Sequence, residues 1–160
     1  MMRLSDVERE TLSGLLSRFG LLLVETRPDQ EIPGSYWGDS EAGLVGNELP
    51  VRPDTPIHSI LHEASHYVCM TLSRRTSLLR DAGGDDAEES AVCYLQVLLA
   101  DFVPGMGRAR MFRDMDGWGY SFRLGSTEAW FERDSEDSRA WLLGRGLIDE
   151  SAAPTWRLRA

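Results

Sequence analysis

The sequence predicts an α+β domain with a helical C-terminal region, and three features of its 160 residues support this fold class. Apolar residues recur at helical spacing in residues 57–72 and 87–102. Residues 28–53 are divided by proline and glycine into pieces long enough only for short strands. The two helical segments are joined by a glycine-containing loop, so we expect them to pack against each other beside a small, twisted β-sheet.

We interpret the chain as a single domain with four parts. Residues 1–53 are expected to form an N-terminal helix and the small sheet, and residues 54–103 a pair of helices that carries the candidate site. Residues 104–150 are expected to form a C-terminal helical subregion. Residues 151–160 are predicted to be a loosely ordered tail, because chain ends that carry no clear pattern are poorly ordered in most domains.

Composition excludes several classes of protein. The chain is 42% hydrophobic and 27% charged, which is typical of a globular domain, and no apolar run approaches the roughly 20 residues needed to cross a bilayer. The N-terminal residues are too charged for a signal peptide, so we expect a cytoplasmic protein without a membrane partner. A net charge of −9 argues against nucleic acid as a partner, because phosphate binding draws on clustered positive charge.

The N-terminal elements are predicted from local signals. Residues 5–8 have the composition of a capping box, and the apolar stripe that follows predicts a helix ending at Gly20. Residues 21–25 form a short apolar run after that stop, which favours a buried strand. Between the prolines and glycines that follow, residues 35–37 and 44–51 are the best candidates for further short strands.

The C-terminal elements are also predicted to be helical. Residues 108–115 mix arginine with apolar residues and predict an amphipathic helix with an exposed basic face. Ser126 and Glu136 begin two further helical segments, in which the tryptophans are expected to lie in the core. Cys69 and Cys93 are too few for a disulfide framework, so we expect both to be small buried residues.

The strongest functional signal in the chain is His62-Glu63-x-x-His66, which lies on the helix predicted at residues 57–72. Residues i and i+4 of a helix share one face, so both imidazoles can bind one metal ion while Glu63 lies beside it. Neutral imidazoles suit Zn²⁺, and a carboxylate next to an open coordination position can take a proton from a water molecule. The pattern therefore predicts His62 and His66 as metal ligands and Glu63 as a general base.

Two histidines require a third protein ligand, which we expect on the helix predicted at residues 87–102. Glu88 is favoured because it begins an apolar stripe that should pack against the metal helix, whereas Glu89 begins a more polar face. If Asp86 is the N-cap of this helix, Glu89 is explained as the second residue of a capping box and need not be a ligand. If Asp85 is the N-cap, the same explanation applies to Glu88 instead. Glu88 is thus the expected ligand, with Glu89, Asp85 and Asp86 as alternatives.

A hydrolytic site also needs a hydrogen-bond donor for the oxyanion that develops on the substrate carbonyl. Tyr120, Arg123 or His58 could supply it, and the spacing of the sequence does not choose among them. His58 lies one turn before His62 on the same helical face. It could therefore equally well line the site, or simply be a polar residue at the start of the helix.

His62-Glu63-x-x-His66, followed by Glu88-x-x-Ala91 at the head of a second helix, resembles the gluzincin branch of the zincin metallopeptidases. With the strand-like segment before the motif, the pattern is also similar to compact bacterial peptidases that cleave phage-type repressors. The resemblance implies a zincin-like fold in which His62, His66 and Glu88 hold Zn²⁺. It further implies hydrolysis of a peptide bond in a protein or peptide substrate, with Glu63 as the general base.

A second resemblance leads to a different chemistry. The pairs His62-Glu63 and Ser65-His66, with an aromatic residue and Cys69 close behind, resemble the motif of elongation factor P hydroxylase. This resemblance implies an iron-dependent protein hydroxylase that acts on a modified lysine of a translation factor and binds Fe²⁺ with the same ligands. A module that keeps the metal for binding, without turnover, is the third alternative.

Overall fold

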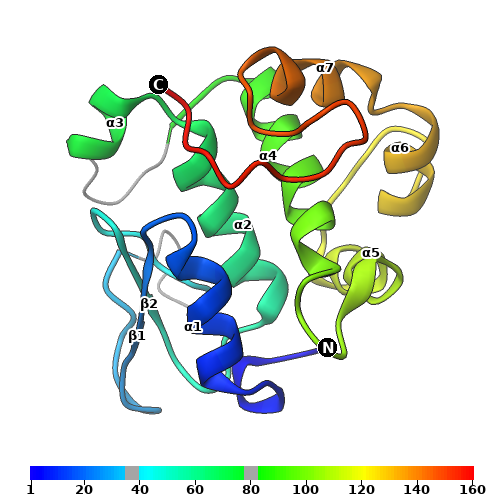
Figure 1. The fold of residues 1–160 in the computed structure, drawn as a ribbon. Helices are drawn as coiled ribbons and strands as arrows, with labels where there is room; N and C mark the ends of the chain where they lie inside the picture. Colours follow the sequence, from blue (N-terminus) through cyan, green and yellow to red (C-terminus); the bar gives the residue numbers. More distant parts are fainter. Residues whose placement is uncertain (35–39, 78–82) are drawn as a thin grey trace.

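The computed structural model describes residues 1–34, 40–77 and 83–160, and over these residues the chain is an α+β fold in which helices dominate (Figure 1). The elements that the described residues form are η1 (Leu4–Asp6, a 3₁₀ helix), α1 (Arg9–Ser17), β1 (Leu22–Glu25), β2 (Glu48–Val51), α2 (Ile57–Cys69), α3 (Leu72–Thr76), α4 (Asp86–Ala100), α5 (Gly107–Trp118), α6 (Thr127–Arg133) and α7 (Glu136–Gly144). The predicted fold class is confirmed at this level.

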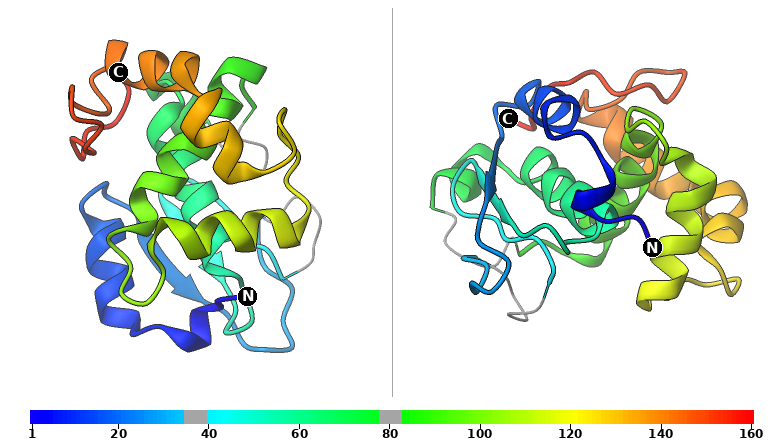
Figure 2. Two further views of the ribbon diagram at one scale, coloured as in Figure 1. Left: turned by 90° about the vertical axis from the view of Figure 1, so that its right-hand side faces the viewer. Right: turned by 90° about the horizontal axis from the view of Figure 1, so that it is seen from below.

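The centre of the molecule is the pair α2 and α4, which lie side by side and run in opposite directions (Figure 1). Their apolar side chains are fully removed from water; Ile60, Ala64, Val92 and Leu99 are each 0% exposed. Burying an aliphatic side chain of this kind contributes about 1.5–3 kcal/mol, so packing rather than helix propensity fixes the pair. Figure 2 shows α1 and the sheet on the α2 side of this pair and α5 to α7 on the α4 side.

The small sheet consists of β1 and β2, which pair in parallel with Leu22 opposite Glu48. On its other edge, β2 forms a hairpin with residues 43–45, because the Gly43 amide donates to the Pro50 carbonyl oxygen at 2.9 Å. β2 is therefore covered along both edges. The strand predicted at residues 21–25 is confirmed as β1, but its predicted burial is wrong, because Leu22 and Val24 are 54% and 37% exposed. The second half of the strand predicted at residues 44–51 is β2. The strand predicted at residues 35–37 lies outside the described residues.

The predicted start of the N-terminal helix is wrong by about one turn. Residues 4–6 form η1, and the Asp6 carboxylate accepts a hydrogen bond from the Arg3 amide at 2.9 Å. α1 begins only at Arg9, with the extended residue Glu8 before it. Ser5 thus lies inside the short 3₁₀ turn that Asp6 closes, and it does not cap α1 as the predicted capping box requires.

The C-terminal helices begin close to where the sequence places them. Ser126 caps α6, because its hydroxyl accepts a hydrogen bond from the Ala129 amide at 3.1 Å. Trp130 on α6 is 5% exposed and stacks on Phe122 with ring centroids 4.4 Å apart. Met111 on α5 is fully buried, which fits the predicted amphipathic helix. Aromatic and apolar packing of this kind holds α5 to α7 against α4.

The tail, predicted to be loosely ordered, is instead packed along the body of the molecule (Figure 1). Trp156 contacts the Phe19 and Phe102 rings at centroid distances of 5.1 and 5.0 Å. The Arg159 amide then donates to the Val68 carbonyl oxygen at 3.0 Å. The aromatic ring buries enough apolar surface to order the segment, and the hydrogen bond fixes its end to the last turn of α2.

Among the described residues, no helix combines the length and the apolar character needed to cross a membrane.

Candidate metal centre

The two histidines of the motif lie on successive turns of α2 and face α4. Their Nε2 atoms are 3.1 Å apart, and the rings stand almost perpendicular with centroids 4.7 Å apart. The opposite face of α2 is held by buried side chains such as Leu61 and Val68, which are at most 1% exposed. The i and i+4 spacing therefore produces the convergence of imidazoles that the sequence predicts.

The carboxylate that meets these imidazoles belongs to Glu89. Its two oxygens lie 3.1 Å from His62 Nε2 and 3.1 Å from His66 Nε2, respectively. One nitrogen or oxygen atom from each of the three residues lies within 4.8 Å of the others. The Glu89 side chain is 50% exposed, against 15% and 9% for the two histidines, so the cluster is open to solvent on the Glu89 side.

The expectation that Glu88 is the third ligand is wrong. Its carboxylate is turned away from the histidines and receives hydrogen bonds from Arg74 Nη1 and Nη2 at 2.8 and 2.7 Å, and from Arg159 Nη1 at 2.9 Å. The Glu88 side chain is only 5% exposed, and its charge is compensated by the two guanidinium groups. The burial that favoured Glu88 thus reflects an ion-pair network.

Gly84 allows this network to form. It has a φ of +98°, and a Cβ atom on Gly84 would clash with Glu88 Oε2. The chain needs a residue without a side chain here, both for the left-handed backbone and for the close approach of the carboxylate.

The aspartates considered as ligands have other roles. Asp85 is the N-cap of α4, since its carboxylate accepts a hydrogen bond from the Glu88 amide at 2.9 Å. Asp86 lines a separate polar pocket of about 460 Å³ together with Arg123 and Asp134. Among the described residues, neither aspartate belongs to the group of His, Cys, Asp and Glu side chains that could hold a metal ion.

Gln96 is a site residue that the sequence interpretation missed. Its Oε1 atom lies 2.8 Å from His62 Nδ1, and its Nε2 atom donates to the His58 carbonyl oxygen at 2.9 Å. Because that carbonyl can only accept, the amide orientation is fixed, and His62 Nδ1 must be the donor to Oε1. In the neutral form of His62 the lone pair then lies on Nε2, the nitrogen that meets the Glu89 carboxylate. A polar residue seven positions after Glu89, inside an otherwise apolar helix, is the signal that could have identified it.

Glu63 has the environment expected of a general base. It follows His62 directly, is partly buried, and lies close enough to His66, His62 and Glu89 to sense their charges. Burial raises the pKa of its carboxyl above the ordinary value, and the histidines oppose this rise. An ionised carboxylate with a raised pKa is a better proton acceptor than an exposed one.

Glu89 and the histidines of the cluster strongly affect each other's charge. Burial acts to raise the pKa of Glu89, but its hydrogen bonds to His62 and His66 dominate and lower it well below the ordinary value. Burial likewise acts to lower the pKa of His62, and the acidic groups around it, Tyr120, Cys93 and Glu89, outweigh burial and raise that pKa well above 6.5. Positive charge is therefore strongly favoured where the three side chains meet.

Of the three expected oxyanion donors, Tyr120 lies at the cluster. Its ring centroid is 5.7 Å from that of His62, and its hydroxyl is 3.3 Å from His58 Nδ1 and 3.4 Å from Gln96 Nε2. Burial raises the pKa of Tyr120 to about 12, so the hydroxyl keeps its proton at neutral pH. Arg123 points elsewhere, since its guanidinium group is 78% exposed and pairs with Asp134.

His58 lies behind the cluster in the core. It is 1% exposed, packs on the Trp118 ring at a centroid distance of 4.9 Å, and burial lowers its pKa to about 3. It is therefore neutral, and within the described part of the chain its Nε2 atom has no hydrogen-bond partner. His58 thus serves as a buried neighbour of Tyr120, and the expected role as an oxyanion donor does not suit its position.

The donor set fits a metal ion on geometric grounds. Two imidazole nitrogens 3.1 Å apart cannot both present lone pairs to each other unless a cation, either a proton or a metal ion, compensates them. Ligand atoms about 2.1 Å from a tetrahedral zinc ion lie about 3.4 Å apart, close to the 3.1 Å separations of this cluster. The tautomer of His62 fixed by Gln96 presents the nitrogen that such an ion requires.

Neither cysteine belongs to this donor set. Cys69 and Cys93 are both buried free thiols, as the sequence predicts, although Cys93 is a close neighbour of His62.

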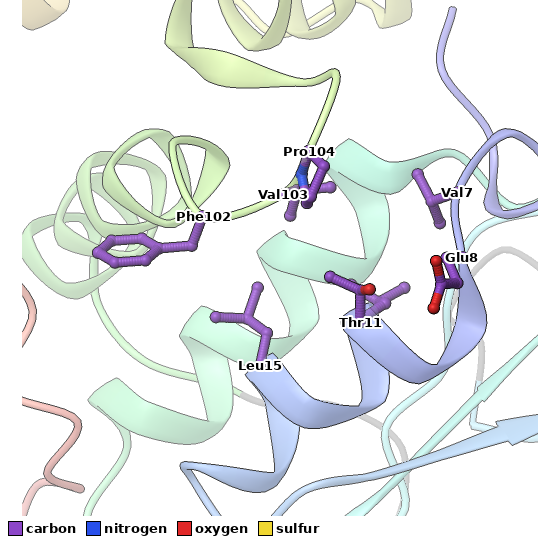
Figure 3. Close-up of a pocket in the computed structure, with 8 residues that line it drawn as sticks. Val7, Glu8, Thr11, Leu15, Phe102, Val103 and Pro104 are labelled. Carbon is purple, nitrogen blue, oxygen red and sulfur yellow. The ribbon is translucent and has the colours of Figure 1, made fainter.

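A small apolar pocket lies at the far end of α4 (Figure 3). It has a volume of about 70 Å³ and is lined by α1 side chains such as Leu15 and by Phe102 and Val103 beyond α4. The helical rise between Glu89 and Ala100 alone separates it from the metal-ligand cluster by about 16 Å. It has no part in the candidate site.

Comparison of the chain with protein-family models, with curated proteins and with solved structures gave no match. The functional interpretation therefore depends on the geometry of the cluster and on the motif that builds it.

Proposed function

We propose that the protein is a zinc-dependent metallopeptidase in which His62, His66 and Glu89 hold the metal ion and Glu63 is the general base. The observation that carries the proposal is the convergence of two Nε2 atoms and one carboxylate, each pair 3.1 Å apart, from two helices packed against each other. Two histidines and one glutamate, with one position left open, form a known catalytic zinc set.

A zinc ion bound there would supply Lewis acidity, lowering the pKa of a water molecule and polarising a substrate carbonyl. Glu63 accepts the proton from the water, for which its raised pKa is suited, and delivers it to the leaving amine. Tyr120 remains protonated beside His62, so its hydroxyl donates a hydrogen bond to the developing oxyanion. The half-exposed side of Glu89 gives a substrate access to these groups.

The choice of a peptide substrate rests on the resemblance of the motif and its partner helix to the gluzincins, with Glu89 in place of the expected Glu88. Retention of Glu63 supports hydrolysis, because a site that only stores a metal has no need for a carboxylate with a raised pKa beside the ligands.

An iron-dependent protein hydroxylase is the alternative, and the same ligand set is compatible with it. Two histidines and one carboxylate with open positions also describe the facial triad of non-haem iron oxygenases. In such an enzyme the ligands would keep their roles, while Glu63 would not be needed to activate a water molecule. The two functions therefore differ in the metal and in the dependence on Glu63.

Metal analysis of the protein purified without added metal, followed by assays of the wild type and of Glu63→Gln with an unfolded protein substrate, tests the proposal. We expect one zinc per chain in both proteins and proteolysis only in the wild type. Iron at one per chain without proteolysis would favour the hydroxylase. Metal in both proteins with no turnover of either kind would leave a binding module, and Glu63→Gln with wild-type proteolysis would overturn the role of Glu63.

A further inference from the structure

Gln96 is a polar side chain in the middle of the helix pair, where it has no contact with water. It is 0% exposed, and its neighbours Leu95 and Val97 on α4 are at most 1% exposed. An amide buried without hydrogen bonds costs roughly 1–3 kcal/mol, so a residue of this kind is tolerated only where its partners satisfy it.

Both ends of the Gln96 amide are satisfied by α2. Its Nε2 atom donates to the His58 carbonyl oxygen at 2.9 Å, and its Oε1 atom accepts from His62 Nδ1 at 2.8 Å. The same Nε2 atom lies 3.4 Å from the Tyr120 hydroxyl. The amide thus connects the backbone of α2 to the ring of one candidate ligand and to the candidate oxyanion donor.

The geometry at this point requires a neutral group that donates on one side and accepts on the other. A glutamate would place a second acceptor oxygen against the His58 carbonyl oxygen, which is repulsive. Leucine would leave both the carbonyl oxygen and His62 Nδ1 without a partner. An asparagine is one methylene shorter and could not span the same two atoms. Glutamine is therefore matched to this pair of contacts.

His66 provides an internal contrast. Within the described residues its buried Nδ1 atom has no hydrogen-bond partner, so its ring is oriented only by packing and by the contacts of Nε2 inside the cluster. Of the two histidines, only His62 has a side-chain partner on Nδ1, the ring nitrogen that faces away from the cluster.

We infer that Gln96 is a positioning residue that holds His62 with its proton on Nδ1 and its Nε2 lone pair aimed at the site of the metal ion. The inference rests on the proposed function, because a lone pair on Nε2 matters only if a metal ion is bound. Hydrogen bonds of this kind orient metal-ligating histidines, and their loss commonly costs 10–100-fold in metal affinity.

The test combines zinc affinity with the protonation of the His62 ring. Zn²⁺ affinity is measured by competition with a chromophoric chelator for the wild type, Gln96→Leu, Gln96→Glu and the control Leu95→Ala. We expect affinity to fall by about 10–100-fold in Gln96→Leu, because the His62 ring loses its partner. We expect Gln96→Glu not to restore full affinity. The control removes a buried side chain from the neighbouring position and should leave affinity within about threefold, which separates loss of positioning from loss of stability.

Nitrogen-15 NMR of the histidine rings gives a readout that a purely structural role would not move. In the zinc-loaded wild type we expect the His62 proton on Nδ1, protected from exchange with solvent, and in Gln96→Leu the protection should be lost. Equal affinity in the wild type and Gln96→Leu, or a His62 ring with Nδ1 unprotonated, would overturn the inference.

The same measurements distinguish failure of this inference from failure of the proposed function. If the wild type binds neither Zn²⁺ nor Fe²⁺ while the His62 Nδ1 proton is still protected, then the metal site is wrong but Gln96 does orient His62. If the wild type binds Zn²⁺ and hydrolyses substrate while the Nδ1 proton is unprotected, then the proposed function stands and the role of Gln96 is refuted.

Discussion

The two faces of α4 carry neighbouring carboxylates in opposite surroundings. On one face Glu88 is almost fully buried and is held by the guanidinium groups of Arg74 and Arg159. On the other face Glu89 is half exposed and meets two imidazoles, which can exchange a proton for a metal ion. The comparison shows that burial alone does not identify a functional carboxylate, because the partners determine whether its lone pairs are available.

Replacing Glu89 should have the largest effect and should fall on metal binding. Glu89→Gln removes the anionic ligand and leaves two neutral imidazoles, fewer than the three protein ligands of ordinary catalytic zinc sites. We expect Zn²⁺ affinity to fall on the order of 1,000-fold, or about 4 kcal/mol, in a chelator-competition titration. Glu88→Gln is the matched control and should stay within about threefold of the wild type. Equal losses in the two variants would remove the distinction between the faces.

Replacing Glu88 should act on stability instead. Glu88→Gln leaves Arg74 and Arg159 without their shared counter-charge, and breaking a buried ion pair costs about 3 kcal/mol, at the lower end of the usual range because both arginines are partly solvated. Urea denaturation of the metal-free proteins measures this loss. Metal-free Glu89→Gln should lose less, since its carboxylate is half exposed, and a larger loss in that variant would contradict the proposed division of roles.

Acid should weaken the packing around His58. His58 has a pKa of about 3 in the folded protein and about 6.5 when unfolded, so between these values the unfolded chain binds a proton that the folded protein does not. The free energy of unfolding contributed by His58 therefore falls as the pH is lowered through this range, by up to about 1.4 kcal/mol per pH unit.

His58→Phe isolates this contribution, because the variant cannot titrate at this position. From pH 7 to pH 5, urea denaturation should show the free energy of unfolding of the wild type falling by about 2 kcal/mol relative to the variant. A constant difference between the two proteins would show that His58 does not stay neutral in the fold.

The smallest effect is expected at Gly84. Gly84→Ala places a Cβ against the Glu88 carboxylate and forces a non-glycine residue to a φ of +98°, which together should cost about 1–2 kcal/mol. The matched control is Gly14→Ala in α1, where a Cβ meets nothing within 4 Å and helix propensity favours alanine by about 0.5–1 kcal/mol. Thermal unfolding should thus show a lower unfolding temperature for Gly84→Ala and a higher one for Gly14→Ala. An unchanged unfolding temperature in Gly84→Ala would show that the Glu88 network can rearrange around the added Cβ.

Periodicity and local signals were enough to predict the main elements. The apolar stripes locate α4 to within two residues and α2 to within three, and the stop at Gly20 locates β1. The tail was missed because order there comes from Trp156 and Arg159 reaching residues far away in the sequence. The predicted start of α1 is wrong because Ser5 is taken into η1, which a local hydrogen bond from the Arg3 amide to Asp6 stabilises.

The site could be predicted only in part for a similar reason. The i and i+4 rule needs only one helix, so His62 and His66 were identified correctly as neighbours. Choosing between Glu88 and Glu89 required knowing which face of α4 meets α2. We assumed that the more apolar face would do so, but the histidines make that face of α2 polar, and Glu89 and Gln96 complement it.

The left-handed glycine beside the Glu88 carboxylate also has a consequence for how this sequence can evolve. If Gly84 were replaced first, the new side chain would clash with Glu88. If Glu88 were replaced first, Arg74 and Arg159 would lose their shared counter-charge. We therefore expect four positions to be conserved or to change together among homologues, namely Arg74, Gly84, Glu88 and Arg159. Position 89 should vary independently of these four, because its residue type depends on metal binding.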